Sequence, residues 1–201
     1  MTTKPAARPG RPRDEATHRA ILRAANRLLH EAGYGGFSIE GVALRAGVAK
    51  TSIYRRWPSK GALLLDLYME GLAPAALEPS GKKVRQAFAA YLNQTVERLK
   101  DAGWSNTLRS LVAEAQNDPA LARLVRDKVI EPRRADGRRL LEHGMKTGEI
   151  RKNVDIDITL DFVFGAIWYR LLLGHAAVDE AFARRVTTAL FKRIGNDLPM
   201  P

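Results

Sequence analysis

The stretch FSIEGVALRAGVAKTSIYRRWPSKGALL, residues 37–64, decides the fold of the N-terminal part of this chain. Ser38 is a favourable N-cap, because its hydroxyl can accept a hydrogen bond from the first turn of a helix over residues 39–46. Gly47 can adopt the left-handed backbone conformation of a turn, and a second short helix is then expected over residues 50–57. The stretch therefore predicts two short helices joined by a tight turn.

The apolar residues of this stretch fit two helices that pack across each other. Ala43 is small where the helices would cross, and the expected internal contacts are Val42, Val48 and Ile53. Gly41 stands in the middle of the first helix, where a better helix former would be usual, and is expected to weaken it locally. A short helix, a glycine turn and a polar second helix form the layout of a helix-turn-helix.

Apolar residues recur at helical spacing along the rest of the chain, and strand signals are absent, so we predict an all-α protein. Before residue 37, a helix capped by Asp14 is expected to end at Gly33. The later helices are expected over residues 60–71, 80–103, 105–116, 118–144, 157–173 and 179–194. Pro132 should kink or split the 118–144 helix.

Breaks in periodicity divide the chain into an arm, a head and a body. Residues 1–13 are rich in Pro, Gly and Arg and are expected to form a flexible basic arm. Residues 14–73 would form the helix-turn-helix head, and a proline-containing break precedes a larger helical body over residues 80–201.

Positive charge is concentrated at the N-terminal end. Residues 1–60 carry 12 Lys and Arg against four Asp and Glu, whereas the other 141 residues carry 21 against 18. Such one-sided charge attracts a polyanion, and nucleic acid fits better than a membrane because no basic amphipathic membrane helix is present. With no cysteine, no apolar stretch long enough to span a membrane and no targeting signal, the expected location is the cytoplasm.

The head resembles the TetR family of transcriptional regulators. The matching residues are the A-x-x-A-G-V turn at 43–48, the helix SIYRRW at 52–57 and Lys60 after the turn. The segment 169–175 (YRLLLGH) is similar to the C-terminal end of one branch of that family. The resemblance implies about nine helices, a homodimer, an inverted-repeat operator, and release from DNA when a small molecule enters the body.

The expected DNA contacts lie around the second short helix. Its N-terminal residues would face base edges in the major groove, and the base-reading candidates are Lys50, Thr51, Ser52 and Arg55. Arg55 could equally hold the DNA backbone, and the role of Arg56 is undecided in the same way. The expected phosphate contacts are Ser38 at a helix N-terminus, Tyr54 and Lys60 by the family match, and Arg56.

Two further predictions concern the head. The arm residues Arg8, Arg11 and Arg13 would reach into the minor groove, although a solvated tail is an equal alternative. Trp57 is expected to pack under the first helix instead of touching DNA.

The body is expected to hold a small-molecule effector in an apolar cavity. The candidate lining residues are Phe88, Tyr91, Leu92, Trp104, Leu108, Leu111, Met145, Phe162, Trp168 and Tyr169. The candidate polar groups are Asn93, Thr95, Arg170 and His175. Since the penultimate helix is apolar almost all round, the last two helices are expected to form half of a four-helix dimer interface.

No metal, cofactor or catalytic site is expected. The four histidines are scattered, and no glycine-rich phosphate loop or nucleophile motif is present. The predicted function is a sequence-specific, ligand-released repressor, although activation is also compatible with such a head. The alternative is a helical small-molecule-binding protein or enzyme whose basic head does not bind specific DNA.

Overall fold

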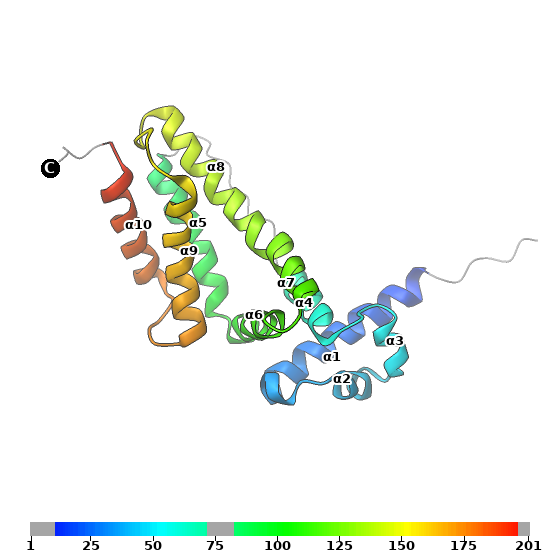
Figure 1. The fold of residues 1–201 in the computed structure, drawn as a ribbon. Coiled ribbons are helices and arrows are strands. Elements are labelled where there is room, and N and C mark those ends of the chain that lie inside the picture. Colours follow the sequence, from blue (N-terminus) through cyan, green and yellow to red (C-terminus); the bar gives the residue numbers. More distant parts are fainter. Residues whose placement is uncertain (1–10, 72–82, 197–201) are drawn as a thin grey trace, which may run out of the picture. The chain divides into compact units, whose positions relative to one another are not determined.

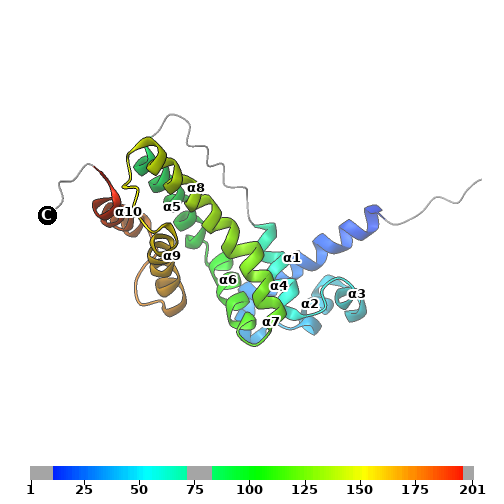
Figure 2. The same ribbon diagram turned by 45° about the horizontal axis from the view of Figure 1, so that its top comes forward.

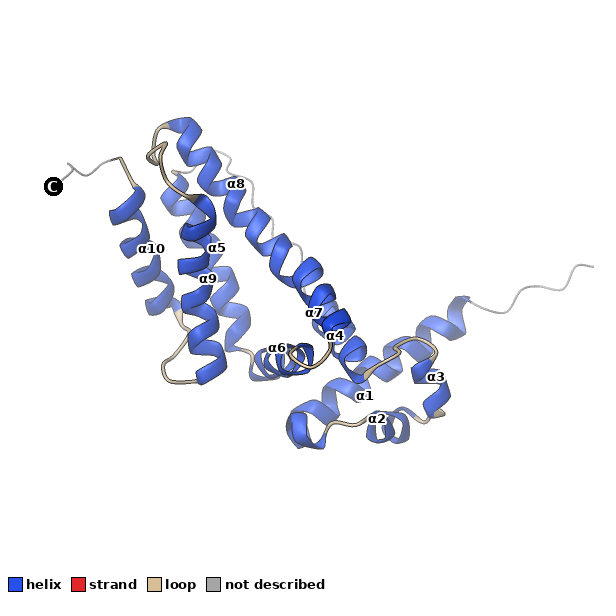
Figure 3. Cartoon of the chain, viewed as in Figure 1, coloured by secondary structure: helices blue, strands red, loops and turns tan. Residues whose placement is uncertain are grey.

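The computed structural model describes residues 11–71 and 83–196, and the chain divides into two compact units, Met1–Gly71 and Leu72–Pro201. The described residues form helices and no strand, apart from a single antiparallel bridge between Ile150 and Gly195 (Figure 3). The all-α prediction is therefore confirmed. The break expected between residues 74 and 79 lies outside the described residues.

The N-terminal unit, called the head below, contains four helices. They are α1 (Arg11–Gly36), α2 (Ile39–Ala46), α3 (Lys50–Tyr54) and α4 (Lys60–Glu70). Helix α1 begins three residues before the Asp14 cap that the sequence suggested. Gly33 interrupts it with a φ of 62°, the conformation expected where the helix was predicted to stop. The core of the head joins all four helices through fully buried residues such as Ile21, Ile53 and Leu63.

Gly41 of α2 has a packing role that the sequence did not reveal. A Cβ atom added at this position would lie 2.8 Å from Cδ2 of Leu28 on α1 and 3.2 Å from Oγ of Ser38. A larger residue at this position would therefore require the Leu28 side chain to move. Gly41, which was expected only to weaken α2, thus also makes room for α1 at this point.

The second unit, called the body below, is a bundle of longer helices. They are α5 (Val84–Lys100), α6 (Ala102–Ala115), α7 (Pro119–Val125), η1 (Arg126–Ile130), α8 (Glu131–Thr147), α9 (Ile156–Leu173) and α10 (Glu180–Ile194). Helices α5, α9 and α10 run side by side, and α8 lies along them (Figures 1 and 2). Their shared core contains Phe88, Tyr91, Leu141 and Leu160, all essentially inaccessible to solvent.

Helices α7, η1 and α8 follow one another without a break. The wider π-turn of η1 lies directly before Pro132, and the N–H of Glu131 reaches back to the carbonyl of Arg126. Because proline cannot donate to the helix ladder, the expected irregularity is this local widening of the helix. Counted as one helix, this segment brings the described residues to nine helices.

Two helix ends in the body differ from the prediction. Gly103 lies in the first turn of α6, because Asp101 caps that helix by accepting from the N–H of Trp104. Gly144 lies inside α8, where a Cβ would come within 2.6 Å of Ile150, and Gly148 with a φ of 77° ends the helix instead. None of the helices described is both long and apolar enough to cross a membrane.

Candidate nucleic-acid interface

Local hydrogen bonds set the angle between α2 and α3. Ser38 caps α2 by accepting from the N–H of Gly41 at 3.1 Å, and Gly47 turns the chain with a φ of 66° and a ψ of 36°. The N–H of Val48 then donates to the carbonyl of Ala43 at 3.0 Å, which closes the turn. Ile53 is 0% exposed and anchors α3 in the core of the head. This arrangement is the helix-turn-helix that the sequence predicted.

The anchored face of α3 leaves the opposite face open to solvent. Lys50, Thr51 and Arg55 are exposed, Ser52 is half-buried, and the side chain of Tyr54 is 48% exposed. The sequence-predicted residues of α3 are therefore brought together on one accessible surface. That surface presents two cations and several hydroxyl groups, the chemistry that suits base edges and phosphates.

Lys50 has a partner that the sequence did not indicate. Its Nζ donates to Oε1 of Glu40 on α2 at 3.1 Å, and both side chains are exposed. The pKa of the Glu40 carboxyl is lowered, first by a backbone hydrogen bond at the start of α2 and then by Lys50. A negative charge thus stands beside the first cation of α3.

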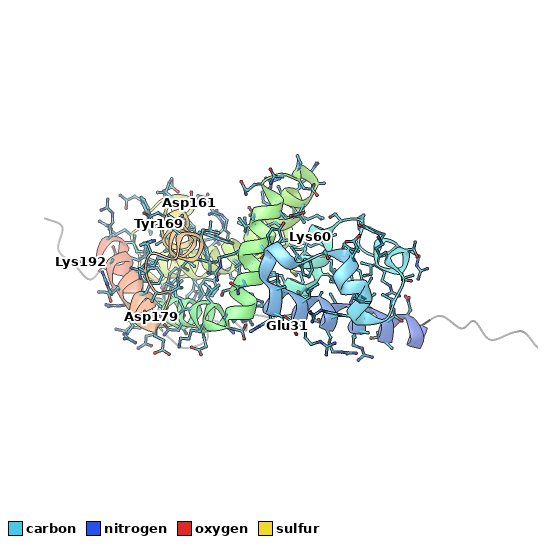
Figure 4. The ribbon with its side chains drawn as sticks, turned by 90° about the horizontal axis from the view of Figure 1, so that it is seen from below. Glu31, Lys60, Asp161, Tyr169, Asp179 and Lys192 are labelled. Atoms are coloured by element: carbon cyan, nitrogen blue, oxygen red, sulfur yellow. The ribbon has the colours of Figure 1, made fainter. Side chains whose placement is uncertain are left out.

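Lys60, which is labelled in Figure 4, lies in the first turn of α4, and its ammonium group contacts two aromatic rings. Its Nζ lies 3.8 Å from the ring centroid of Tyr34 and 5.7 Å from that of Phe37. Partial burial lowers the pKa of Lys60, because desolvation penalises the charged form. Tyr34 was not among the residues singled out from the sequence, since its contact depends on how α1 packs beside α4.

Arg56 lies in a different setting from the other predicted phosphate contacts. Its guanidinium pairs with the carboxylate of Asp14, and Nη1 donates to the Asp14 carbonyl at 3.1 Å. Only 16% of its side chain is exposed. Arg56 therefore ties α3 to the start of α1, and the open face of α3 does not include it.

Trp57 packs under the first helix, as predicted. It is nearly fully buried, stacks on His18 of α1 with ring centroids 5.1 Å apart, and donates from Nε1 to Asp66 at 2.9 Å. Of the arm residues, Arg8 and the side chains of Arg11 and Arg13 lie outside the described residues. Their minor-groove role stays a prediction.

The expected effector-cavity residues fall into two groups in the body. The first group lies in or near the core: Phe88, Tyr91, Leu92, Leu108 and Leu111 are buried, and Trp104, Met145 and Trp168 are half-buried. The second group is Phe162 and Tyr169, which are 68% and 59% exposed on the outer face of α9. These two do not line the interior, because the helices that the structure describes cover only one side of the apolar helix α9.

Some of the polar groups expected in that cavity already have hydrogen-bond partners or lie outside the core. Oγ1 of Thr95 donates to the carbonyl of Tyr91 at 3.1 Å, and Arg170 donates to Ala177 at 2.6 Å and stacks on Phe182. His175 lies against the Tyr169 ring outside the core. Oδ1 of Asn93 is buried and accepts no hydrogen bond from any described residue. Asn93 alone of these four presents an unused buried polar atom.

The open, hydroxyl-rich and cationic face of α3, carried on a capped helix-turn-helix, defines a DNA-binding head. Two family models cover the chain: "Bacterial regulatory proteins, tetR family" matches residues 21–67, and "Tetracyclin repressor-like, C-terminal domain" matches residues 78–190. The chain belongs to the TetR family of DNA-binding transcriptional regulators, which confirms the resemblance.

Individual relatives agree with this assignment. The chain is 34% identical over 186 residues to the HTH-type transcriptional regulator YdeS of Bacillus subtilis, covering 92% of this chain and 93% of that protein. It is similar to the crystal structure of the TetR family regulator SCO0332, with a TM-score of 0.68, 33% identity, and coverage of 88% and 97%. The fold is also that of Bacillus subtilis FadR in complex with stearoyl-CoA, with a TM-score of 0.70, 19% identity, and coverage of 87% and 97%.

Proposed function

We propose that this protein is a cytoplasmic repressor that binds an inverted-repeat operator as a homodimer and leaves it when a small, largely apolar molecule binds the body. The observation that carries the proposal is the open face of α3, where Lys50, Thr51 and Arg55 are exposed while Ile53 anchors the helix. A catalytic role has no such support, so we propose that the protein is not an enzyme.

Some residues of the head would contact base edges, and others would contact phosphates. Lys50, Thr51 and Ser52 lie at the N-terminal end of α3, which enters the major groove in a helix-turn-helix. Tyr54 and Lys60 would hold phosphates, with the N-terminus of α2 at Ser38 as a further phosphate site. Arg55 is exposed and can serve either purpose, whereas Arg56 would have to leave Asp14 to do so.

The exposed face of α9 supports a dimer. Ile158, Phe162, Tyr169 and Leu172 are large apolar residues open to solvent, and with the exposed Gly165 they follow one another at intervals of four and three residues. This spacing is typical of a helix seam that packs against another helix. A second copy, together with α10 of each chain, would cover the seam in a four-helix arrangement. Two-fold symmetry would then require an inverted repeat in the operator.

The proposed effector binds inside the body. Most buried side chains of α5, α6 and α9 are apolar, and Asn93 offers a buried oxygen that accepts no hydrogen bond from a described residue. FadR, which shares this fold, holds stearoyl-CoA, a molecule with a long apolar chain. A predominantly apolar effector is the class that such an interior accepts.

The operator can be found by selecting duplexes from a random pool with the full-length protein. We expect an enriched inverted repeat whose half-sites are about one helical turn apart. Lys50→Ala should relax the selection at one position of each half-site. Lys128→Ala, which removes an exposed cation of the body, is the matched control and should leave the selected sequence unchanged. Recovery of unrelated sequences would contradict specific recognition.

A reporter gene placed behind the selected operator tests repression. Expression should fall when the protein is present and should recover with an apolar inducer. Activation of the reporter would contradict the repressor assignment while leaving DNA recognition intact.

A further inference from the structure

A basic groove runs along the body between α5 and α10, which lie side by side in Figures 1 and 2. It has a volume of about 830 Å³ and is lined by Lys83, the first half of α5, residues of α10 from Arg184 onward and Glu149. This volume falls within the range of small-molecule sites, roughly 300 to 1,000 Å³. Every residue that lines the groove belongs to the body, and none belongs to α2 or α3 of the head.

The charge of the groove is strongly one-sided. Four cationic side chains line it, namely Lys83 and Arg85 from α5 and its N-cap, and Arg184 and Lys192 from α10. Within the described ranges, no carboxylate pairs with Lys83, Arg85 or Lys192, and Arg184 has only a distant partner in Glu180, 3.8 Å away. Lys192 projects outward from α10 in Figure 4.

Among the described residues that line the groove, Glu149 is the one carboxylate, and both of its oxygens accept hydrogen bonds. Oε2 of Glu149 accepts from the backbone N–H of Val84 at 3.0 Å, and Oε1 accepts from the hydroxyl of Thr147 at 3.1 Å. Glu149 thereby caps the start of α5 and joins it to the end of α8. Its own hydrogen bonds hold the carboxylate at the end of α8, so the lining of the groove carries four cations against one carboxylate.

The floor of the groove is apolar. Ala89 and Phe191 line it, and the hydroxyl of buried Thr187 is used within α10, where it donates to the carbonyl of Ala183 at 2.9 Å. The aliphatic stems of the lysines and arginines can extend this apolar surface. Cations at the rim and an apolar floor together suit a molecule that carries a negative group on an apolar body.

We propose that this groove binds a small amphiphilic anion, in which a phosphate, sulfate or carboxylate meets Lys83, Arg85 and Lys192 while an apolar chain or ring lies over Ala89 and Phe191. The site is additional to the interior effector cavity, and it does not depend on DNA binding. Its concave shape favours a dissolved molecule over a flat membrane surface.

Titration calorimetry of the full-length protein tests the site with decyl phosphate, kept below its micellar concentration. We expect Lys83→Gln/Lys192→Gln to weaken decyl phosphate binding by roughly tenfold or more, since two charge-assisted contacts are lost. The matched control, Arg123→Gln/Lys128→Gln, removes two exposed cations elsewhere in the body and should bind as the wild type does. Ala89→Trp, which fills the groove without changing its charge, should also abolish binding.

The other outcomes separate the alternatives. Equal binding by the wild type and by both groove variants would place decyl phosphate elsewhere and overturn the proposal, as would no binding at all. Decanol or inorganic phosphate binding as tightly as decyl phosphate would contradict the amphiphilic class. The protein could instead co-sediment with vesicles that contain phosphatidylglycerol, and the double variant could lose this binding. That result would overturn the proposal, because the groove would then bind a membrane surface and not a small molecule. Circular dichroism and operator binding of each variant show whether it is folded.

Discussion

Lys50 and Glu40 form an ion pair across the helix-turn-helix, with 3.1 Å between Nζ of the lysine and Oε1 of the carboxylate. The pair joins the first residue of α3 to the first turn of α2, and both side chains face solvent. The cation proposed to read a base is thus held by a carboxylate before DNA arrives. A base edge must compete with Glu40 for Lys50, while a phosphate near this point is repelled by the carboxylate.

Glu40→Gln should therefore make DNA binding tighter and less selective. The freed Lys50 cation would raise the affinity for any duplex by no more than a few-fold, because an exposed ion pair is weak. Fluorescence anisotropy with the operator and with a scrambled duplex would measure the ratio of the two affinities. Glu31→Gln, which releases Arg45 from a similar surface pair, is the control. An unchanged ratio in Glu40→Gln would show that the pair plays no part in selectivity.

Lys60→Ala and Tyr54→Phe should both weaken DNA binding, but only Lys60→Ala should change how the affinity depends on salt concentration. Loss of the lysine removes one cation from a phosphate, so the slope of log affinity against log salt should fall by about one. Tyr54→Phe removes a neutral hydrogen-bond donor, so affinity should fall for all sequences with the slope unchanged. The measurement is anisotropy over a salt series. A Lys60→Ala protein with the wild-type slope would exclude Lys60 from the phosphate contacts.

Tyr34→Leu should weaken operator binding through Lys60. The ring holds Nζ at 3.8 Å from its centroid, and its loss costs the order of 0.5–1 kcal/mol, a two- to fivefold change in affinity. Tyr34→Phe keeps the ring and should bind normally. A double-mutant cycle with Lys60→Ala separates the causes. If Tyr34→Leu lowers operator affinity by the same factor in the Lys60→Ala background, the ring acts independently of the lysine.

Leu172→Glu should convert the protein into monomers. The charge would enter the apolar seam on α9, where it could be neither solvated nor paired. Sedimentation velocity would report the change, and operator binding should fall with it because two half-sites need two heads. Leu124→Glu places the same charge on an exposed apolar residue of α7 and should remain dimeric. A dimer that survives Leu172→Glu would move the interface away from α9.

Tyr91→Phe should change how stability depends on alkaline pH. Burial raises the pKa of the Tyr91 hydroxyl, which donates to the Arg133 carbonyl at 2.8 Å, above its ordinary value of 10.0. The folded state thus keeps a proton that the unfolded state loses above pH 10, so wild-type stability falls as pH rises from there. Tyr91→Phe should cost about 1 kcal/mol at neutral pH and flatten this fall. Urea unfolding between pH 7 and 11 measures both effects, and equal slopes would contradict the assignment.

The sequence by itself determined the elements whose signals are local. Ser38, Gly47 and Pro119 act through their own backbone or through a neighbouring turn, so the helix-turn-helix and the start of α7 could be predicted from residue type and spacing. Asp155 caps α9 for the same kind of reason, by accepting from the N–H of Ile158 at 3.1 Å. Charge that is concentrated in one segment also survives folding, which is why a DNA-binding head was predictable.

Only the tertiary structure decided which of several suitable side chains are free to act. Arg55 and Arg56 are adjacent and chemically alike, but the packing of α3 against α1 pairs Arg56 with Asp14 and leaves Arg55 exposed. Gly41 was expected to weaken α2, and only the packed structure shows that its missing side chain makes room for Leu28. Phe162 and Tyr169 were expected in the interior, yet a helix that is apolar all round carries no signal for which face its own chain will cover.

The basic groove is a further product of tertiary structure. Lys83 and Lys192 are more than a hundred residues apart in the chain, and the antiparallel packing of α5 and α10 places them on one surface. Helical periodicity specifies which residues share a face of one helix, but it does not specify which two faces meet. Contacts between distant segments depend on the packing of the whole core. Those contacts in turn determine which side chains are free, which are paired and which are buried.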